Sequence, residues 1–169
     1  MRGRSLRCGT IGAASALTLF VAGFPIGRAK AQENEPPAIR HDPPVCGRAE
    51  ARARLCAYVV DDTGIAQVRL SFRARGARAY YWTPMTFDGA LYCAWLPAPL
   101  AATRTVEYYV EAIDDKFEPS RTADHALAVT GDCGAALQEA PDLPAAVGTT
   151  VSGQPPSPEG FDPETFKPR

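Results

Sequence analysis

The sequence is poor in the residues that carry most enzyme chemistry. It contains two histidines, His41 and His125, and no serine or cysteine motif of the nucleophile-elbow type accompanies either of them. Each histidine is therefore interpreted as a surface or turn residue and not as a catalytic base. The sequence predicts no catalytic residue and no cofactor.

Long apolar runs are missing after the first 31 residues. Within those residues, three early arginines precede an uncharged stretch at 8–27, and an Ala-x-Ala pattern follows at 29–31. This arrangement predicts a signal peptide at 1–31, a mature chain that starts at Gln32, and export to the periplasm or the extracellular space. An uncleaved anchor is the less favoured alternative, because the apolar run is shorter than the ~20 residues of a spanning helix. We expect no membrane span in the mature chain.

A surplus of positive charge is also lacking. The chain has 18 basic and 19 acidic residues, and the five charges of the predicted signal peptide are all basic, so 13 basic residues remain and the mature net charge is −6. Nucleic-acid binding and adhesion to anionic lipid both rest on clustered Lys and Arg, and both are disfavoured. The partner that we expect is an envelope or extracellular protein, and a glycan stays possible.

Alternating apolar and polar residues are what the sequence has in abundance. The segment Thr105 to Asp115 reads TVEYYVEAIDD, in which every second residue suits a buried face. The segments Ile65 to Arg73 and Ala90 to Pro97 follow the same rule, and turn residues separate them. The pattern predicts a small all-β domain. The residues expected to point inward in the first segment are Val106, Tyr108, Val110 and Ala112, and those expected to point outward are Glu107, Tyr109 and Glu111.

Four stretches together, RLCAYVVDDTGIAQVRLSFR, YYWTPM, GALYCAWLPAP and TVEYYVEAIDD, resemble the bacterial immunoglobulin-like or fibronectin type III-like modules of exported proteins. The resemblance covers Pro37 to Asp132 and implies a fold but no activity. It implies a seven-stranded sandwich at 38–133, preceded by a leader at 32–37. The implied strands are Ala38 to Val45, Arg54 to Val60, Ala66 to Arg73, Ala79 to Thr86, Ala90 to Leu96, Thr105 to Ile113 and Ala123 to Thr130.

The cysteines after the signal peptide are even in number and favour two disulfides in an exported chain. None form the close pair that zinc prefers. Side-chain alternation places Cys56 and Cys93 on one outer face, so they would pair if their strands are neighbours, as the second and fifth strands of the resembled sandwich are. Cys46 would then meet Cys133. Three connectivities are possible, and alternation favours this one.

The C-terminal segment 134–169 is rich in proline and poor in large apolar residues. This composition predicts an extended, disordered tail whose deletion leaves the fold intact. If the tail instead docks on the sandwich, Phe161 and Phe166 are the side chains expected to hold it.

Acidic residues gather at two predicted strand ends. Asp61 and Asp62 follow one strand, Asp114 and Asp115 follow another, and Glu118 is close in sequence. In the resembled fold the loops after these strands share one end, so five carboxylates make a weak calcium candidate. The D-x-D-x-D pattern of specific calcium loops is missing, and aspartate is a common turn former. The sequence therefore predicts no metal site.

Outward positions near the proposed Cys56 to Cys93 bridge are unusually apolar. They include Tyr58, Val60, Leu91 and Trp95, which form a candidate surface for a protein partner. Alternatively, the first strand or the tail covers them.

Outward residues of the other sheet are charged. Arg69 and Arg73 are expected to form cross-strand ion pairs with Glu107 and Glu111. A glycan surface formed by Tyr80, Tyr81 and Trp82 beside Arg75 and Arg78 is a weaker alternative. The sequence as a whole predicts a noncatalytic secreted or cell-envelope module that binds a partner or has a structural role. A carbohydrate-binding or accessory module of an extracellular enzyme complex is the alternative.

Overall fold

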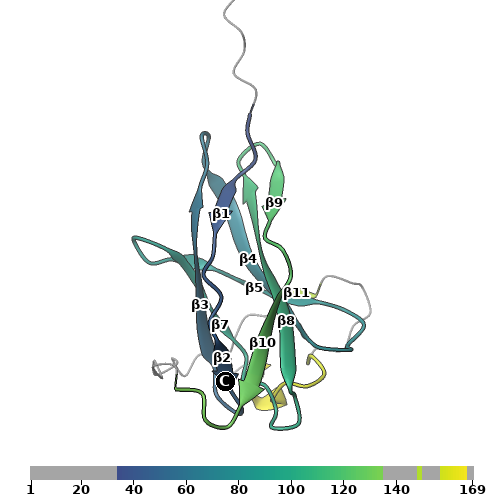
Figure 1. Cartoon of the computed structure of the whole chain (residues 1–169). Helices are drawn as coiled ribbons and strands as arrows, with labels where there is room; N and C mark the ends of the chain where they lie inside the picture. The colour runs from purple at the N-terminus through teal and green to yellow at the C-terminus, as the bar shows by residue number, and fades with distance from the viewer. Residues whose placement is uncertain (1–33, 135–147, 150–156, 167–169) are drawn as a thin grey trace, which may run out of the picture. The chain divides into compact units, whose positions relative to one another are not determined.

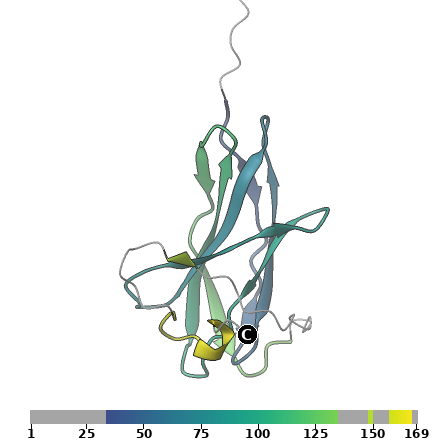
Figure 2. The same cartoon turned by 180° about the vertical axis from the view of Figure 1, so that it is seen from behind.

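The residues that the structure describes form two β-sheets (Figures 1 and 2). The computed structural model describes residues 34–134, 148–149 and 157–166. The predicted signal peptide, its cleavage site and the first leader residues lie outside the described residues. The all-β class is confirmed, since the only helix in the described residues is a single 3-10 turn at Pro163–Phe166.

The smaller sheet has four strands, all antiparallel to their neighbours. Its long central strand is β3, and β1 and β7 flank that strand. In spatial order the strands are β1 (Ala38–Arg40), β3 (Ala53–Val60), β7 (Tyr92–Leu96) and β6 (Thr86–Phe87).

The larger sheet has seven strands and is built around the long antiparallel pair β4 and β8. In spatial order the strands are β11 (Gly148–Thr149), β5 (Tyr81–Pro84), β4 (Ile65–Ala74), β8 (Thr105–Asp114), β10 (His125–Thr130) and β2 (Cys46–Arg48). The seventh strand, β9 (Pro119–Arg121), pairs with the C-terminal part of β8. The β2 to β10 pairing is parallel.

The expected count of seven strands is not confirmed, because one expected strand is divided and β2, β9 and β11 lie outside the expected ranges. The segment 38–45 gives β1 to the small sheet, and the chain then crosses at Pro43 and Pro44 to form β2 in the large sheet. Proline has no amide hydrogen to donate and so interrupts a ladder. The segment 79–86 divides at Pro84, after which Met85 is buried and its amide donates to the Val68 carbonyl at 2.9 Å. The last expected strand, Ala123 to Thr130, contains only β10, and β9 precedes it as an additional strand.

The core lies between the two sheets and follows the predicted alternation. All four residues expected to point inward on β8 are fully buried, and residues of β3, β4 and β7 pack against them. Burial of such side chains is the main stabilising term of a small domain. The largest fully buried apolar side chains are Tyr108, Phe72, Leu55, Leu70, Leu96, Leu127, Val106 and Val110.

Two disulfides clamp the sandwich, Cys46 to Cys133 and Cys56 to Cys93. These are the pairs that side-chain alternation favoured. Cys56 and Cys93 are directly opposite on β3 and β7, and the Cys56 carbonyl accepts a bond from His41 on the side away from β7. The pair is therefore a non-hydrogen-bonded one, where strands approach most closely, and its Cα atoms are 4.1 Å apart.

The prediction of a disordered tail is wrong for residues 157–166. Phe161 is only 2% exposed and its ring packs on Phe72 with 5.1 Å between centroids. The Gly160 carbonyl accepts bonds from the Leu100 amide at 2.9 Å and the Thr103 hydroxyl at 2.7 Å. A Cβ at Gly160 would lie 2.7 Å from the Ala74 Cβ, so only glycine permits this close approach. Burial of the Phe161 ring holds this segment on the sandwich, although its composition is mostly polar and proline-rich.

Candidate functional site

The acidic turn between β3 and β4 is closed by Asp61. Its Oδ1 accepts bonds from the amides of Thr63 and Gly64, both at 2.9 Å, and from the Thr63 hydroxyl at 2.8 Å. The two backbone bonds, from Gly64 and then Thr63, lower the pKa of Asp61. The carboxylate thus acts as a turn former.

Asp114, at the end of β8, closes the opposing loop. The residue is completely buried, and its Oδ1 accepts bonds from the amides of Lys116 at 2.9 Å and Glu118 at 2.7 Å. Its other oxygen accepts a bond of 2.6 Å from the side-chain amide of Asn34. Sequence reasoning missed the contact with Asn34, because the two residues are 80 positions apart.

The two acidic loops meet, but they do not form a calcium cage. The Asp115 amide donates to the Gly64 carbonyl at 3.0 Å, and the Asp115 carboxylate pairs with the Lys116 ammonium at 3.3 Å. Asp62 and Glu118 are exposed. In the part of the chain that the structure describes, no three His, Cys, Asp or Glu side chains are arranged to hold a metal ion. Backbone amides occupy one oxygen of Asp61 and one of Asp114, so these two carboxylates act as turn formers.

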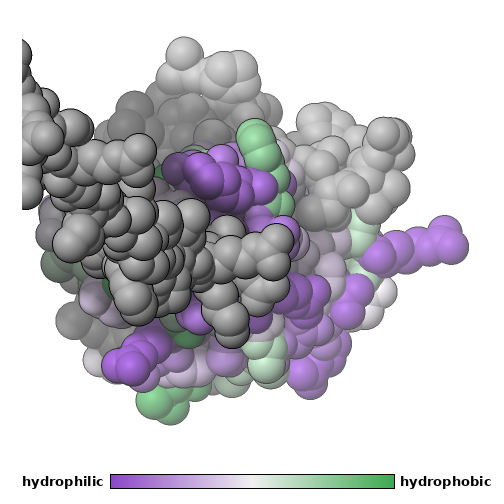
Figure 3. Space-filling view, turned by 90° about the horizontal axis from the view of Figure 1, so that it is seen from above, coloured by the Kyte–Doolittle hydropathy of each residue, from purple (hydrophilic) through white to green (hydrophobic). Residues whose placement is uncertain are grey.

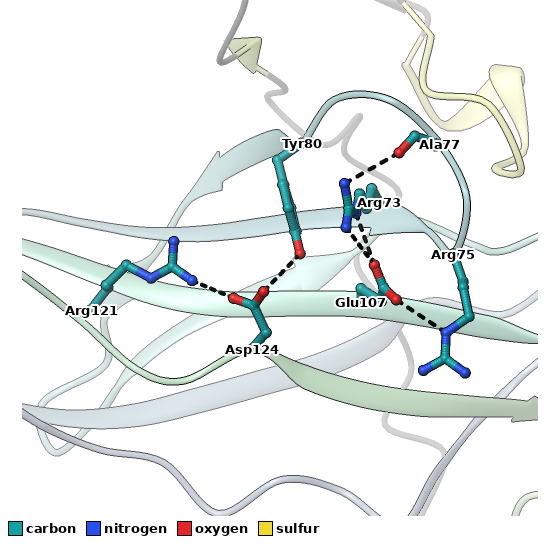
Figure 4. Close-up of polar contacts among 7 residues, drawn as sticks. All are labelled: Arg73, Arg75, Ala77, Tyr80, Glu107, Arg121 and Asp124. Carbon is teal, nitrogen blue, oxygen red and sulfur yellow. Dashed lines mark hydrogen bonds and ion pairs between the residues drawn. The ribbon is translucent and has the colours of Figure 1, made fainter.

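The outer face of the large sheet carries a network of arginines and carboxylates (Figure 4). Arg73 lies opposite Glu107 and pairs with it at 2.8 Å, and Arg75 reaches the second oxygen of the same carboxylate at 3.0 Å. The hydrogen bond from Arg73 is the main reason that the pKa of Glu107 is lowered. A weaker contact of 3.9 Å joins Arg69 to Glu111, so both predicted cross-strand ion pairs are confirmed.

Each of three arginines on this face also lies over an aromatic ring. The guanidinium carbons of Arg69, Arg73 and Arg121 lie 4.5, 4.4 and 4.0 Å from the centroids of Trp82, Tyr80 and Tyr109 respectively. Such contacts are attractive and cover one face of each ring. Asp124 completes the network through an ion pair with Arg121 and a bond of 3.4 Å from the Tyr80 hydroxyl (Figure 4).

This network bears on two sequence expectations. Tyr109, expected to be outward, does lie on the outer face but is only 8% exposed, because Arg121 and Tyr80 cover it. No local pattern could have revealed that cover, since Arg121 belongs to a different strand. Tyr81 faces the core and is 4% exposed, so the three consecutive aromatic residues do not form a sugar-stacking platform.

The outer face of the small sheet is different, because its apolar side chains are open to solvent. Tyr58 is 47% exposed, Val60 42% and Leu91 37%. Trp95 on β7 is half-buried. Phe87 on the edge strand β6 is 54% exposed, but it pairs with Tyr92 and therefore lies on the other side of this sheet. An open groove of about 690 Å³ adjoins this face, and Tyr58, Leu91 and the Cys56 bridge contribute to its lining. The predicted outward positions are thus brought together on one surface.

Both histidines lie at the edge of the core and not in simple turns, which corrects the sequence interpretation. His41 Nδ1 is 2.7 Å from the Cys56 carbonyl, which can only accept, so Nδ1 donates. His41 Nε2 lies within hydrogen-bond distance of the Tyr108 hydroxyl, at 2.9 Å. The His125 ring lies 5.2 Å from the His41 ring. Burial and then the neighbouring His41 lower the pKa of His125. The register that places His125 opposite Tyr108 was the signal that sequence reasoning missed.

Comparison with known proteins adds no family assignment. No protein-family model matches the sequence, and no curated protein shows significant similarity to it. Across residues 34–134, 148–149 and 157–166, no helix has the length and hydropathy needed to cross a membrane.

Proposed function

We propose that this chain is a noncatalytic exported module of the immunoglobulin-like or fibronectin type III-like kind, which binds a protein of the envelope or the extracellular space. The observation that carries the proposal is the open apolar face of the small sheet, formed by Tyr58, Val60 and Leu91. Aromatic and aliphatic side chains gathered on one surface are typical of the centres of protein interfaces.

The framework around this face supports an extracytoplasmic role. Disulfides form and persist in oxidising compartments, and this domain has two of them. One bridge, Cys56 to Cys93, lies within the small sheet itself and joins its two central strands. The face is thereby held in a fixed shape before a partner arrives, which reduces the entropy lost on binding.

A carbohydrate-binding role has less support. The rings on the large sheet that could stack on a sugar are the ones that arginines cover, Tyr80, Trp82 and Tyr109. Sugar stacking requires a free ring face, and on these rings an arginine covers one face.

The test compares two leucines of equal exposure. Leu91 is 37% exposed on the apolar face, and Leu100 is 39% exposed outside that sheet. Chemical cross-linking of the exported protein in its own cells, followed by mass spectrometry, should give a specific protein adduct that Leu91→Ser reduces several-fold and Leu100→Ser leaves unchanged. Equal adduct yields from the two variants would show that this face is not the binding surface. Trp95 is a poorer probe, because it is half-buried and its loss also removes packing.

A further inference from the structure

The turn between β8 and β9 (residues 114–118) contains a residue in an unfavourable backbone conformation. Phe117 has a φ of 67°, in the left-handed region. Its amide donates to the Asp114 carbonyl at 3.3 Å, and the Asp114 amide donates to the Glu118 carbonyl at 3.3 Å. This is the hairpin in which a tight turn is followed by one left-handed residue.

Phenylalanine is a poor choice for that position. The left-handed residue of such a hairpin is ordinarily glycine or asparagine, because a bulky side chain clashes with the backbone there. Packing does not compensate for the strain, since the Phe117 side chain is 83% exposed. It is the most exposed aromatic side chain among the described residues. Neither the backbone nor the core therefore accounts for the ring.

The backbone that carries the Phe117 ring is held in place by several hydrogen bonds. Asp114 is completely buried and holds the amides on both sides of Phe117, those of Lys116 and Glu118. The side chain of Asn34 and the Gly64 carbonyl tie the same turn to two other parts of the chain. A strained residue that its surroundings hold in place is a recurring feature of recognition sites. A ring on an already ordered backbone also loses little conformational entropy when it is bound.

The charges around Phe117 indicate the chemistry of the partner. Three exposed carboxylates surround the turn, those of Asp62, Asp115 and Glu118, and the single cation Lys116 already pairs with Asp115. Figure 3 looks onto this end of the sheets, where hydrophilic residues predominate among the coloured atoms and apolar ones are isolated. An anionic lipid surface would repel this cluster.

We propose that Phe117 is the anchor of a second contact surface, which inserts into an apolar pocket with a basic rim on a partner protein. The exposed ring supplies apolar contact, and the carboxylates match Lys and Arg around the pocket. This surface is separate from the apolar face of the small sheet and goes beyond the function proposed for that face.

A photo-reactive phenylalanine tests the proposal directly. Phe117→p-benzoylphenylalanine in the exported protein should give one protein adduct on illumination, and raising the salt from about 0.15 M to about 1 M should reduce its yield several-fold, because exposed charge pairs are screened. The matched control is Phe87→p-benzoylphenylalanine, whose ring is 54% exposed on the small sheet. A lipid adduct, a dimer of this chain, or no adduct beyond the one at position 87 overturns the proposal.

Competition with unlabelled protein separates binding from folding. Phe117→Gly relieves the left-handed strain, so its melting temperature should rise by a few degrees, yet it should block the cross-link at least tenfold less well than the wild type. Leu91→Ser should compete for the Phe117 cross-link as well as the wild type does. This expectation does not depend on whether the small sheet binds a partner. Undiminished competition by Phe117→Gly would refute the inference at any melting temperature, and a lower melting temperature would show in addition that the ring stabilises the fold.

Discussion

Replacing Phe161 by alanine should destabilise the whole domain, although the residue lies near the end of the chain. The side chain is 2% exposed, belongs to the main core cluster and meets the Phe72 ring edge to face. A buried phenylalanine removes about 150 to 250 Å² from water, which at about 25 cal/mol per Å² corresponds to about 4 to 6 kcal/mol. Measured Phe to Ala costs in cores are about 3 to 5 kcal/mol, and we expect a value in that range.

The assay is urea unfolding followed by the fluorescence of Trp82 and Trp95. Phe87→Ala is the control, because that ring is 54% exposed, and it should change the free energy of unfolding by less than about 1 kcal/mol. Deleting residues from 157 onward removes the same side chain, so the deletion should lower the free energy of unfolding at least as much as Phe161→Ala does. A loss below about 1 kcal/mol for Phe161→Ala would refute the docking of segment 157–166 and restore the prediction of a dispensable tail.

Two further outcomes follow from the histidine pair and the disulfides. The pKa of His125 is lowered from 6.5, so below that pH the unfolded chain binds more protons than the folded one, and stability should fall as the pH is lowered through 6.5. His125→Gln should flatten this slope in urea titrations at several pH values. A slope that is unchanged in the variant would contradict the assignment. The bridge between Cys46 and Cys133 closes 87 residues, so Cys46→Ser with Cys133→Ser should cost about 4 to 5 kcal/mol, and unreduced mature protein should take up no alkylating agent. Full stability of the double variant or labelling of more than one cysteine would contradict that reading.

The sequence revealed the parts of the fold that depend on local alternation. The inward face of β8 and the shared side of Cys56 and Cys93 both follow from a period of two, and the structure has them as predicted. What sequence reasoning missed depends on distant partners. Asn34 reaches Asp114, Arg121 covers Tyr109, and Phe161 returns to the core, and in each case the contacting residue lies in another element.

The crossings between the two sheets have a different cause. Proline at positions 43, 44 and 84 leaves the amide ladder without donors, and the chain uses these points to cross between sheets. The residues themselves were visible in the sequence, but the direction of each crossing depends on which sheet offers a free edge. That information belongs to the assembled fold, and so the strand count could not be predicted.

Aromatic side chains are covered on the outer face of the large sheet and exposed on the outer face of the small sheet. This contrast bears on where a partner would bind. On the large sheet, Tyr109 is covered by an arginine that a carboxylate in turn holds, so a partner would have to break existing contacts before it gained new ones. On the small sheet, Tyr58 is exposed beside a disulfide, and a partner would displace only water. Equal areas on the two faces would therefore give unequal affinities, because only the second face offers unsatisfied apolar surface on a fixed support. This difference supports the placement of the proposed protein interface on the small sheet.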